Sequence, residues 1–387
     1  MKRLLIINNI VTPYRIFMFN KMYEKGNKLG IEVFVAFQAR HYIDYSWKPE
    51  DFDMKFPHYI SSGLFPSKQR QKDNFTFYTI NCDIIKDVIY GYYDWIIMSP
   101  FMSLTTMILS IVPIRKTKLL LWFESNSDSS RYQQKFIQKL RSIIVKRYSA
   151  LVCPGQRAIE YIYSFDPNSE NKTIIYLPNI VDRSLFLNKI NKYRKYKEKI
   201  RNTLGFSKTD LLILVIGRLV ALKGHDLLIK AISKDIDKYK IIIVGNGPLK
   251  NYLKNLINQN NLSNRIKLVG QCSQEEVSKY LAIADWLIHP SIRDAAPLAT
   301  VEAIIAGLPI VSSIQTGNAP EVINEDINGF TFNPLNTKQI INALNRISMT
   351  SRRKREAMSK ASKKIAKERF DPDKVLSRFF INLMRIT

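Results

Sequence analysis

The chain has 387 residues, too many for one ordinary core and suited to two domains of roughly 150 to 200 residues each. Apolar residues make up 46% of the sequence and occur throughout it, which excludes an intrinsically disordered protein. The formal net charge of +26 exceeds what solubility requires and predicts an anionic partner or surface.

Short apolar runs alternate with helical patterns from the N-terminus onward, which predicts a parallel sheet with crossover helices. The expected strands are 4–8, 31–37, 95–98, 119–123, 150–153 and 173–177. Asn8 and Asn9 end the first apolar run and no small-residue cleavage site follows, so we expect a buried strand and no signal peptide. The longest apolar stretch, 98–114, is shorter than the ~20 residues that span a bilayer, so we expect no transmembrane helix.

Segment 131–148 carries cations, no acid, and apolar residues on another face, which predicts a basic amphipathic helix. Its cations are Arg131, Lys135, Lys139, Arg141, Lys146 and Arg147. Such a helix can lie on an anionic membrane, where each cation near the surface contributes ~1 kcal/mol. A surface helix whose apolar stripe faces its own sheet fits the pattern equally well, so both interpretations stay open.

The alternation restarts near residue 211 and predicts a second parallel sheet. The expected strands are 211–216, 241–244, 266–269, 286–289 and 310–312. A polar, lysine-rich stretch follows Pro178, and we place the domain boundary there. The sequence therefore predicts two α/β domains, residues 1–178 and residues 179–355. The three cysteines are far apart and lack zinc-type spacing, which favours a reducing cytoplasm.

The loop after strand 211–216 carries Arg218 and Lys223, each beside a glycine. Such loops line the cleft at the carboxyl edge of an open parallel sheet, where ligands bind. Arginine can grip two phosphate oxygens and lysine adds a compact charge, so the pair suits a diphosphate. A solvated basic loop explains this segment alone equally well.

Two carboxylates, Asp294 and Glu302, are separated by seven residues around a helix start expected near Pro297. Free backbone N–H groups of the first turn, around Pro297, Leu298 and Thr300, would then form an anion site. Glu302 lies more than a turn into the helix and can accept hydrogen bonds from a ribose, while Asp294 can meet sugar hydroxyls. An ordinary helix-face carboxylate also fits Glu302 taken alone.

Together these segments resemble family 4 of the glycosyltransferases. The shared motifs are Gly-Arg-Leu-x-x-x-Lys-Gly at 217–224, Val-Gly-Asn-Gly-Pro-Leu at 244–249, and Ala-x-x-x-Gly-Leu-Pro at 303–309 after the carboxylate pair. Asn-Ile-Val-Asp at 179–182 and Thr-Pro-Tyr-Arg at 12–15 match further signatures. Several motifs in order and at the right spacing are much more specific than any one alone.

The resemblance implies a GT-B architecture, in which two Rossmann-like domains with parallel sheets face a central cleft. Residues 1–178 would bind the acceptor, residues 179–355 the nucleotide-sugar, and a helix in 356–387 would cross back to the first domain. It also implies a retaining, metal-independent glycosyl transfer with no cofactor besides the nucleotide-sugar co-substrate. Similar enzymes often act on lipid-linked or surface-glycan saccharides, so we expect a cytoplasmic protein that is peripheral on the inner membrane face.

The same resemblance assigns roles to individual residues. Arg218 and Lys223 would hold the diphosphate, Glu302 the ribose and Asp294 the transferred sugar. Gly217, Gly245 and Gly247 would let backbone approach the nucleotide, although a glycine-rich strand end is equally a tight turn. The remaining assignments are Pro297, Leu298 and Glu321 beside the donor, and Tyr14 and Arg15 on the acceptor side.

Two departures from the family pattern concern the site. The first carboxylate is usually Glu and is here Asp294, with Ala295 and Ala296 in place of Gly-Phe, which leaves the sugar identity open. Members often carry a histidine after a strand of the first domain, where segment 121–128 has none. Glu124 is the candidate for that place, and a solvent-facing carboxylate fits it equally well. The four histidines are isolated, so no metal site is expected.

Two other functions stay open at this point. A nucleotide-sugar epimerase on the same architecture would isomerise the sugar without an acceptor. A nucleic-acid-binding protein would use the net charge of +26 to hold phosphates. Because the cations are dispersed and not interleaved with stacking aromatics, we expect no nucleic-acid partner.

Overall fold

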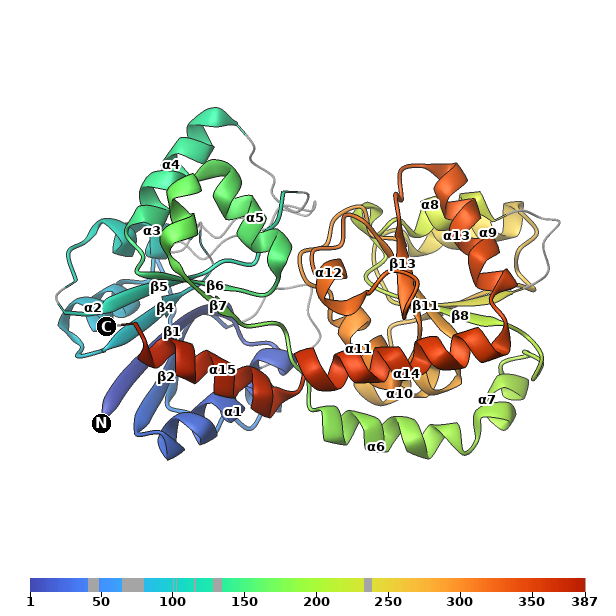
Figure 1. Cartoon of the computed structure of the whole chain (residues 1–387), viewed down its shortest axis with the longest axis horizontal. Coiled ribbons are helices and arrows are strands. Elements are labelled where there is room, and N and C mark those ends of the chain that lie inside the picture. The colour runs from blue at the N-terminus through green and yellow to red at the C-terminus, as the bar shows by residue number, and fades with distance from the viewer. Residues whose placement is uncertain are drawn as a thin grey trace.

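The computed structural model describes residues 1–40, 49–64, 80–99, 101, 103–114, 116–127, 134–232 and 239–386. These residues form two α/β halves that lie side by side, each built on one parallel sheet (Figure 1). The N-terminal half is joined to the C-terminal half after β7 and again between the last two helices (Figure 1).

The first sheet has the strand order β3-β2-β1-β4-β5-β6-β7 in the described residues. Its strands are β1 Lys2–Ile10, β2 Ile31–Ala39, β3 His58–Ile60, β4 Trp95–Met98, β5 Lys118–Trp122, β6 Ala150–Cys153 and β7 Thr173–Tyr176. Its helices are α1 Pro13–Lys28, α2 Cys82–Tyr90, α3 Leu104–Ile111, α4 Lys135–Lys146 and α5 Gln156–Phe165. Side chains alternate across β1, so Leu4 and Ile6 join one core cluster and Leu5 and Ile7 join the other.

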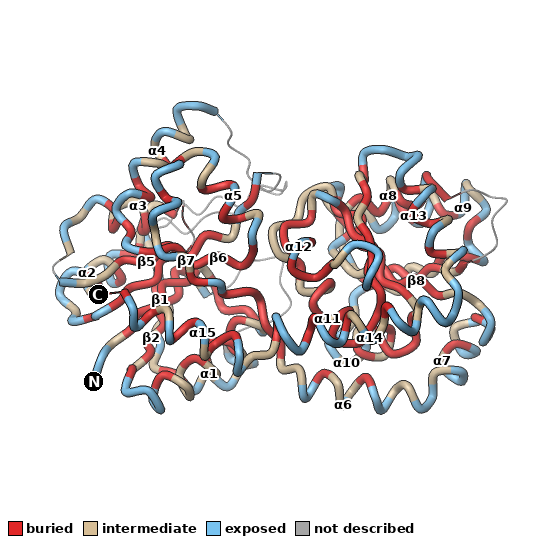
Figure 2. The backbone as a smooth tube through the Cα atoms, in the orientation of Figure 1, coloured by how far each residue is buried: buried red, intermediate tan, exposed pale blue. Residues whose placement is uncertain are grey.

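The second sheet has the order β10-β9-β8-β11-β12-β13. Its strands are β8 Leu212–Ile216, β9 Lys240–Val244, β10 Ile266–Gly270, β11 Trp286–His289, β12 Ile310–Ser313 and β13 Gly329–Phe332. Its helices are α6 Arg183–Arg194, α7 Lys197–Thr203, α8 His225–Ala231, α9 Lys250–Gln259, α10 Gln274–Ile283, α11 Leu298–Ala306, α12 Ala319–Val322 and α13 Thr337–Met349. Buried residues again concentrate in the strands, between two helical layers (Figure 2).

Each strand expected from the sequence is present, with ends that differ by at most two residues. β3 and β13 were not predicted; they are short strands of three and four residues at the edges of their sheets. In both sheets the direction of strand addition reverses beside the first strand, at β1/β4 and at β8/β11. This reversal opens a crevice at the carboxyl ends of those strands, where α/β proteins bind ligands.

The C-terminal segment is divided into α14, Arg352–Arg369, and α15, Pro372–Met384. α14 packs on α11 and α12 of the second half, whereas α15 packs on α1 and β7 of the first (Figure 1). Pro372 lacks a backbone N–H and cannot continue α14, and the Asp371 side chain caps α15 through the Lys374 N–H at 3.2 Å. The chain therefore crosses between the halves at residues 370–372.

Among the described residues, no helix combines the length and the apolarity that a membrane span requires.

Burial of α15 in the first core predicts a large stability cost for Phe380→Ala. Phe380 is fully buried among Phe379, Leu383 and α1. The substitution should lower the free energy of unfolding of the N-terminal half by about 3–5 kcal/mol, measured by urea denaturation. Ile381→Ala, on the exposed face of the same helix, should change it by less than about 1 kcal/mol. Equal effects of the two substitutions would contradict this docking of α15.

Candidate functional site

The candidate site lies where the strand order of the second sheet reverses. β8 and β11 are hydrogen-bonded neighbours, so the loop 217–224 after β8 and the loop 290–297 after β11 emerge side by side. Ile292 N donates to Leu222 O at 2.9 Å, and the Ser291 hydroxyl donates to the same oxygen at 3.0 Å. These bonds hold the two loops together as one unit.

Lys223 and Asp294, one from each loop, form an ion pair in the crevice. His289, at the carboxyl end of β11, places its Nε2 3.1 Å from the same Asp294 oxygen. Burial raises the pKa of the Asp294 carboxyl, but Lys223 and His289 outweigh this effect and lower that pKa to about 2. Asp294 is therefore ionised at neutral pH, with a lysine and a histidine on one carboxylate oxygen.

Gly224 fixes the geometry beside Lys223. Its φ of 64° lies in the left-handed region, and an added Cβ would overlap the carbonyl oxygen of Pro290. A residue with a side chain would thus strain the backbone and separate the two loops. The glycine next to the lysine is explained by loop packing.

Arg218 lies on the same loop with an exposed side chain. Its carbonyl oxygen accepts a hydrogen bond from His225 Nε2 at 3.1 Å. Burial lowers the pKa of His225 to about 4, so the ring is neutral and acts as a fixed donor at neutral pH. His225 thereby anchors the backbone that carries Arg218.

Gly217, Gly245 and Gly247 lie at or just beyond the ends of β8 and β9, where the backbones of the two segments are in close contact. An added Cβ at Gly245 would overlap the carbonyl oxygen of Gly217, and one at Gly247 would lie 2.6 Å from the carbonyl oxygen of Leu219. Close packing of the two strand ends accounts for Gly245 and Gly247. Their predicted contact with a nucleotide stays a prediction.

α11 begins at Leu298, with Pro297 as the residue before the first turn. Asn318 Nδ2 donates to Pro297 O at 3.0 Å and fixes the entry to the helix. The side chain of Leu298 packs against the core of the second half. Glu302, one turn further along, is partly buried, and burial raises the pKa of its carboxyl to about 7.

Arg15, one of the two predicted acceptor-side residues, pairs with Glu124 in the first half. Arg15, near the start of α1, is 2% exposed and forms an ion pair with Glu124 after β5. Its guanidinium lies 4.1 Å from the ring centre of Trp122 and 5.0 Å from that of Tyr14. Arg15 thus holds Glu124 and is itself enclosed, while Tyr14 is half-buried.

The two halves touch around the crevice. Glu321 of α12 accepts hydrogen bonds from Gln156 N at 2.7 Å and from the Tyr176 hydroxyl at 3.1 Å. An added Cβ at Gly317 of the second half would overlap the Asn126 side-chain amide of the first half. Figure 1 shows α12 between the halves. Glu321, predicted to lie beside the donor, is therefore also a contact between the halves.

The basic helix of the first half agrees with its prediction only in part. Arg141 is buried, and its guanidinium donates to the Tyr161 hydroxyl at 2.6 Å, so it points into the domain and cannot contact a membrane. Lys135, Lys139, Lys146 and Arg147 are exposed, as are the apolar side chains of Phe136 and Ile143. Arg131 lies outside the described residues.

His289 is a site residue that the sequence analysis did not identify, because the isolated histidines indicated no metal site. Its position at the end of β11, next to the strand-order reversal, was the available signal. Among the residues that the structure describes, no three His, Cys, Asp or Glu side chains are grouped so that they could hold a metal ion.

Comparison with known sequences gives a match in the C-terminal half. The family model of Glycosyl transferases group 1 matches residues 196–365. An uncharacterized glycosyltransferase of Methanocaldococcus jannaschii, MJ1607, is 30% identical over 156 residues, which are 39% of this chain and 40% of that protein. The amylovoran biosynthesis glycosyltransferase AmsK of Erwinia amylovora is 34% identical over 145 residues, 35% of each chain. The chain thus spans well under two thirds of these relatives' lengths.

Comparison with solved structures extends over the whole chain. Anabaena Alr3699/HepE in complex with UDP superposes with a TM-score of 0.76 at 19% identity, covering 100% of both chains. A glycosyltransferase from Rickettsia africae gives a TM-score of 0.73 at 17% identity and covers 100% of this chain and 98% of that one. The predicted GT-B architecture is confirmed, and residues 196–365 are similar in sequence to group 1 glycosyl transferases.

Proposed function

We propose that the protein is a retaining, metal-independent glycosyltransferase that moves a sugar from a nucleotide-sugar to a saccharide acceptor. The observation that carries the proposal is the meeting of Lys223, Asp294 and His289 at the strand-order reversal of a half that matches the group 1 glycosyl transferases. HepE, which shares the fold, has been crystallised with UDP and with UDP-glucose. A UDP-sugar is therefore the first donor to test.

The Lys223–Asp294 pair suits a donor with both a diphosphate and a sugar. A diphosphate in the crevice competes for the Lys223 ammonium, and the ionised Asp294 then accepts hydrogen bonds from sugar hydroxyls. Arg218 is exposed on the same loop, and its guanidinium would bind phosphate oxygens of the donor. Positive charge placed where the leaving group becomes negative stabilises the transition state.

The transfer exchanges one bond at the anomeric carbon. The bond from this carbon to the phosphate oxygen breaks, and the acceptor hydroxyl oxygen bonds to the same face. The acceptor proton passes to the departing phosphate oxygen, so no protein side chain need act as the base. Glu124, which forms an ion pair with Arg15 in the first half, would orient the acceptor.

The acceptor is proposed to be a lipid-linked or surface-glycan saccharide reached at the cytoplasmic membrane face. Support comes from α4, where exposed Phe136 and Ile143 accompany the cations Lys135, Lys139 and Lys146. Exposed apolar side chains beside cations are typical of helices that insert into an anionic interface. AmsK, similar over 145 residues, acts in amylovoran biosynthesis.

Lys223→Ala should lower turnover by about a hundredfold or more, because it removes charge that stabilises the leaving diphosphate. Transfer is measured with UDP-, GDP- and ADP-sugars and an acceptor mixture, with and without EDTA. Lys230→Ala removes an exposed lysine of α8 and should change turnover less than about twofold. Turnover near the unsubstituted rate in Lys223→Ala would refute the assignment, and epimerised donor without transfer would refute the reaction class.

The affinity for UDP should fall as the pH drops below 7, because ribose hydroxyls donate to an ionised Glu302. With a free-state pKa of about 7, Glu302 is mostly protonated at pH 6 and mostly ionised at pH 8. Binding that requires the carboxylate should tighten by about tenfold between these values. Titration calorimetry should show this dependence reduced in Glu302→Gln and retained in Glu170→Gln, an exposed control in the first half. Identical pH profiles in all three proteins would exclude the ribose contact.

Phe136→Ser combined with Ile143→Ser should weaken binding to phosphatidylserine-containing vesicles by about tenfold or more, since both side chains would leave the lipid interface. Leu335→Ser with Met349→Ser removes two equally exposed apolar side chains from the other half and should have little effect. Vesicle sedimentation measures both. Weakened vesicle binding in the control pair, or unchanged vesicle binding in the α4 pair, would exclude α4 as the membrane contact.

A further inference from the structure

A second, strongly basic cavity lies at the opposite edge of the second sheet. It has a volume of about 1390 Å³. It is bounded by α6, α7, residues 352–363 of α14 and the amino ends of three strands. Leu211, Asp285 and Pro309 line it immediately before β8, β11 and β12. Lys223 and Asp294 follow the other ends of β8 and β11, roughly 15 Å away for strands of this length. The cavity is therefore separate from the candidate donor site.

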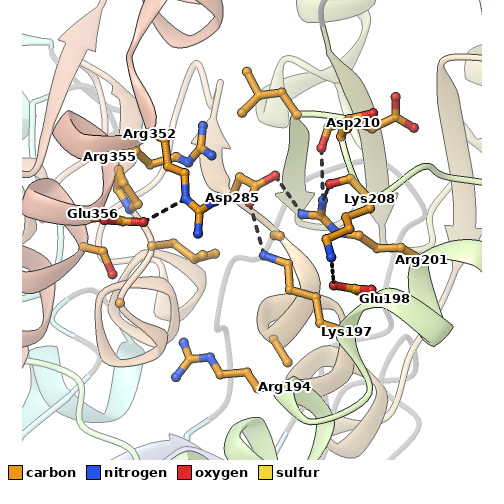
Figure 3. A pocket seen from close by; sticks show the side chains of 18 of the residues that line it. Arg194, Lys197, Glu198, Arg201, Lys208, Asp210, Asp285, Arg352, Arg355 and Glu356 are labelled. Carbon is orange, nitrogen blue, oxygen red and sulfur yellow. Dashed lines mark hydrogen bonds and ion pairs between the residues drawn. The ribbon is translucent and has the colours of Figure 1, made fainter.

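Positive charge dominates this cavity. Nine basic side chains and four acidic ones line it, so its walls carry a clear excess of cations. Figure 3 shows Arg194 on the α6 wall and Arg352 and Arg355 on the α14 wall of the same hollow. An excess of this size in one concave space attracts and concentrates anions.

Three of the four acids, Asp285, Glu356 and Glu198, already form ion pairs with other cations. Asp285 binds both Lys197, at 3.2 Å, and Arg201, at 2.7 Å (Figure 3). Arg201 is almost fully buried and also donates to Ile283 O and Asp210 O, so it serves the fold. Glu356 pairs with Arg352 at 3.0 Å. Arg355 and Lys363 have no acidic partner among the described residues.

The positively charged side chains that line the cavity repel one another. Burial lowers the pKa of Lys197, and Arg201 and Arg355 lower it further against the attraction of Asp285. Burial also lowers the pKa of Lys363, and Arg194 adds to this effect. Charges that repel across a partly enclosed space are relieved by an anion between them. The arrangement of cations thus favours a negative ligand.

We propose that this cavity is a second binding site, for a soluble molecule that carries two or three linked phosphates. Arginines bind phosphate oxygens in pairs, and the hydroxyls of Thr209 and Ser359 add neutral donors to the walls. One phosphate would leave most of the excess charge uncompensated, whereas a linked chain spans both walls. The cavity lies beside α7, far from α4 in Figure 1, so a soluble ligand reaches it without the α4 surface.

The test uses sodium tripolyphosphate and a full-length chain with Arg218→Ala and Lys223→Ala, which removes the donor-site cations. Titration calorimetry in this background should detect binding to the cavity. Arg355→Glu with Lys363→Glu should weaken it by about tenfold or more, as expected for the loss of charged hydrogen bonds. Arg355→Lys with Lys363→Arg keeps both charges and should retain binding.

Lys360→Glu with Lys364→Glu is the matched control, because it makes the same charge change on exposed positions of α14 outside the cavity. It should alter the affinity less than about threefold, and thermal unfolding of each variant verifies the fold. No binding in the donor-deficient background, or equal weakening in the test and control pairs, would overturn the proposal. If the protein binds phosphatidic acid vesicles and tripolyphosphate cannot displace it from them, the proposal of a soluble ligand would be overturned. Because the donor-site cations are absent throughout, these outcomes are independent of the proposed transferase activity.

Discussion

The reversal of strand order in each sheet is the constraint on which the candidate site depends. Parallel strands cannot be joined by tight turns, so each loop at the carboxyl edge leads into a helix that crosses one face of the sheet. Beside the first strand, the helices that follow two neighbouring loops lie on opposite faces, and a crevice opens between the loops. In the second sheet this places the loops after β8 and β11 side by side. Lys223 and Asp294 are 71 positions apart in the sequence and become partners for this reason.

The Lys223–Asp294 pair also determines the charge balance of the crevice. A buried carboxylate without a partner is costly, and Lys223 with His289 offsets that cost. A bound diphosphate would form an ion pair with the Lys223 ammonium in competition with Asp294. Sugar hydroxyls would then donate hydrogen bonds to the Asp294 carboxylate. The same residues thus stabilise the protein without ligand and exchange partners when a nucleotide-sugar enters.

Sequence patterns predicted the central strands because these are buried on both faces and read as continuous apolar runs. β3 and β13 were missed because three or four residues at a sheet edge carry little periodic signal. Loop position and cation spacing indicated Lys223 and Asp294, but nothing local showed that His289 would contact Asp294 or that Arg141 would turn inward to Tyr161. Contacts between distant elements depend on packing, which a single sequence does not display.

The contacts between the halves differ in kind, and this difference bears on how a ligand enters. α15 is buried in the core of the first half, so its docking is hydrophobic and costly to break. Beside the crevice the contacts are polar: Glu321 of the second half accepts hydrogen bonds from Gln156 N and from the Tyr176 hydroxyl of the first half. Water can replace these bonds at small net cost. We therefore expect the crevice to open by parting the polar contacts around α12 while α15 stays docked, with residues 370–372 as the pivot.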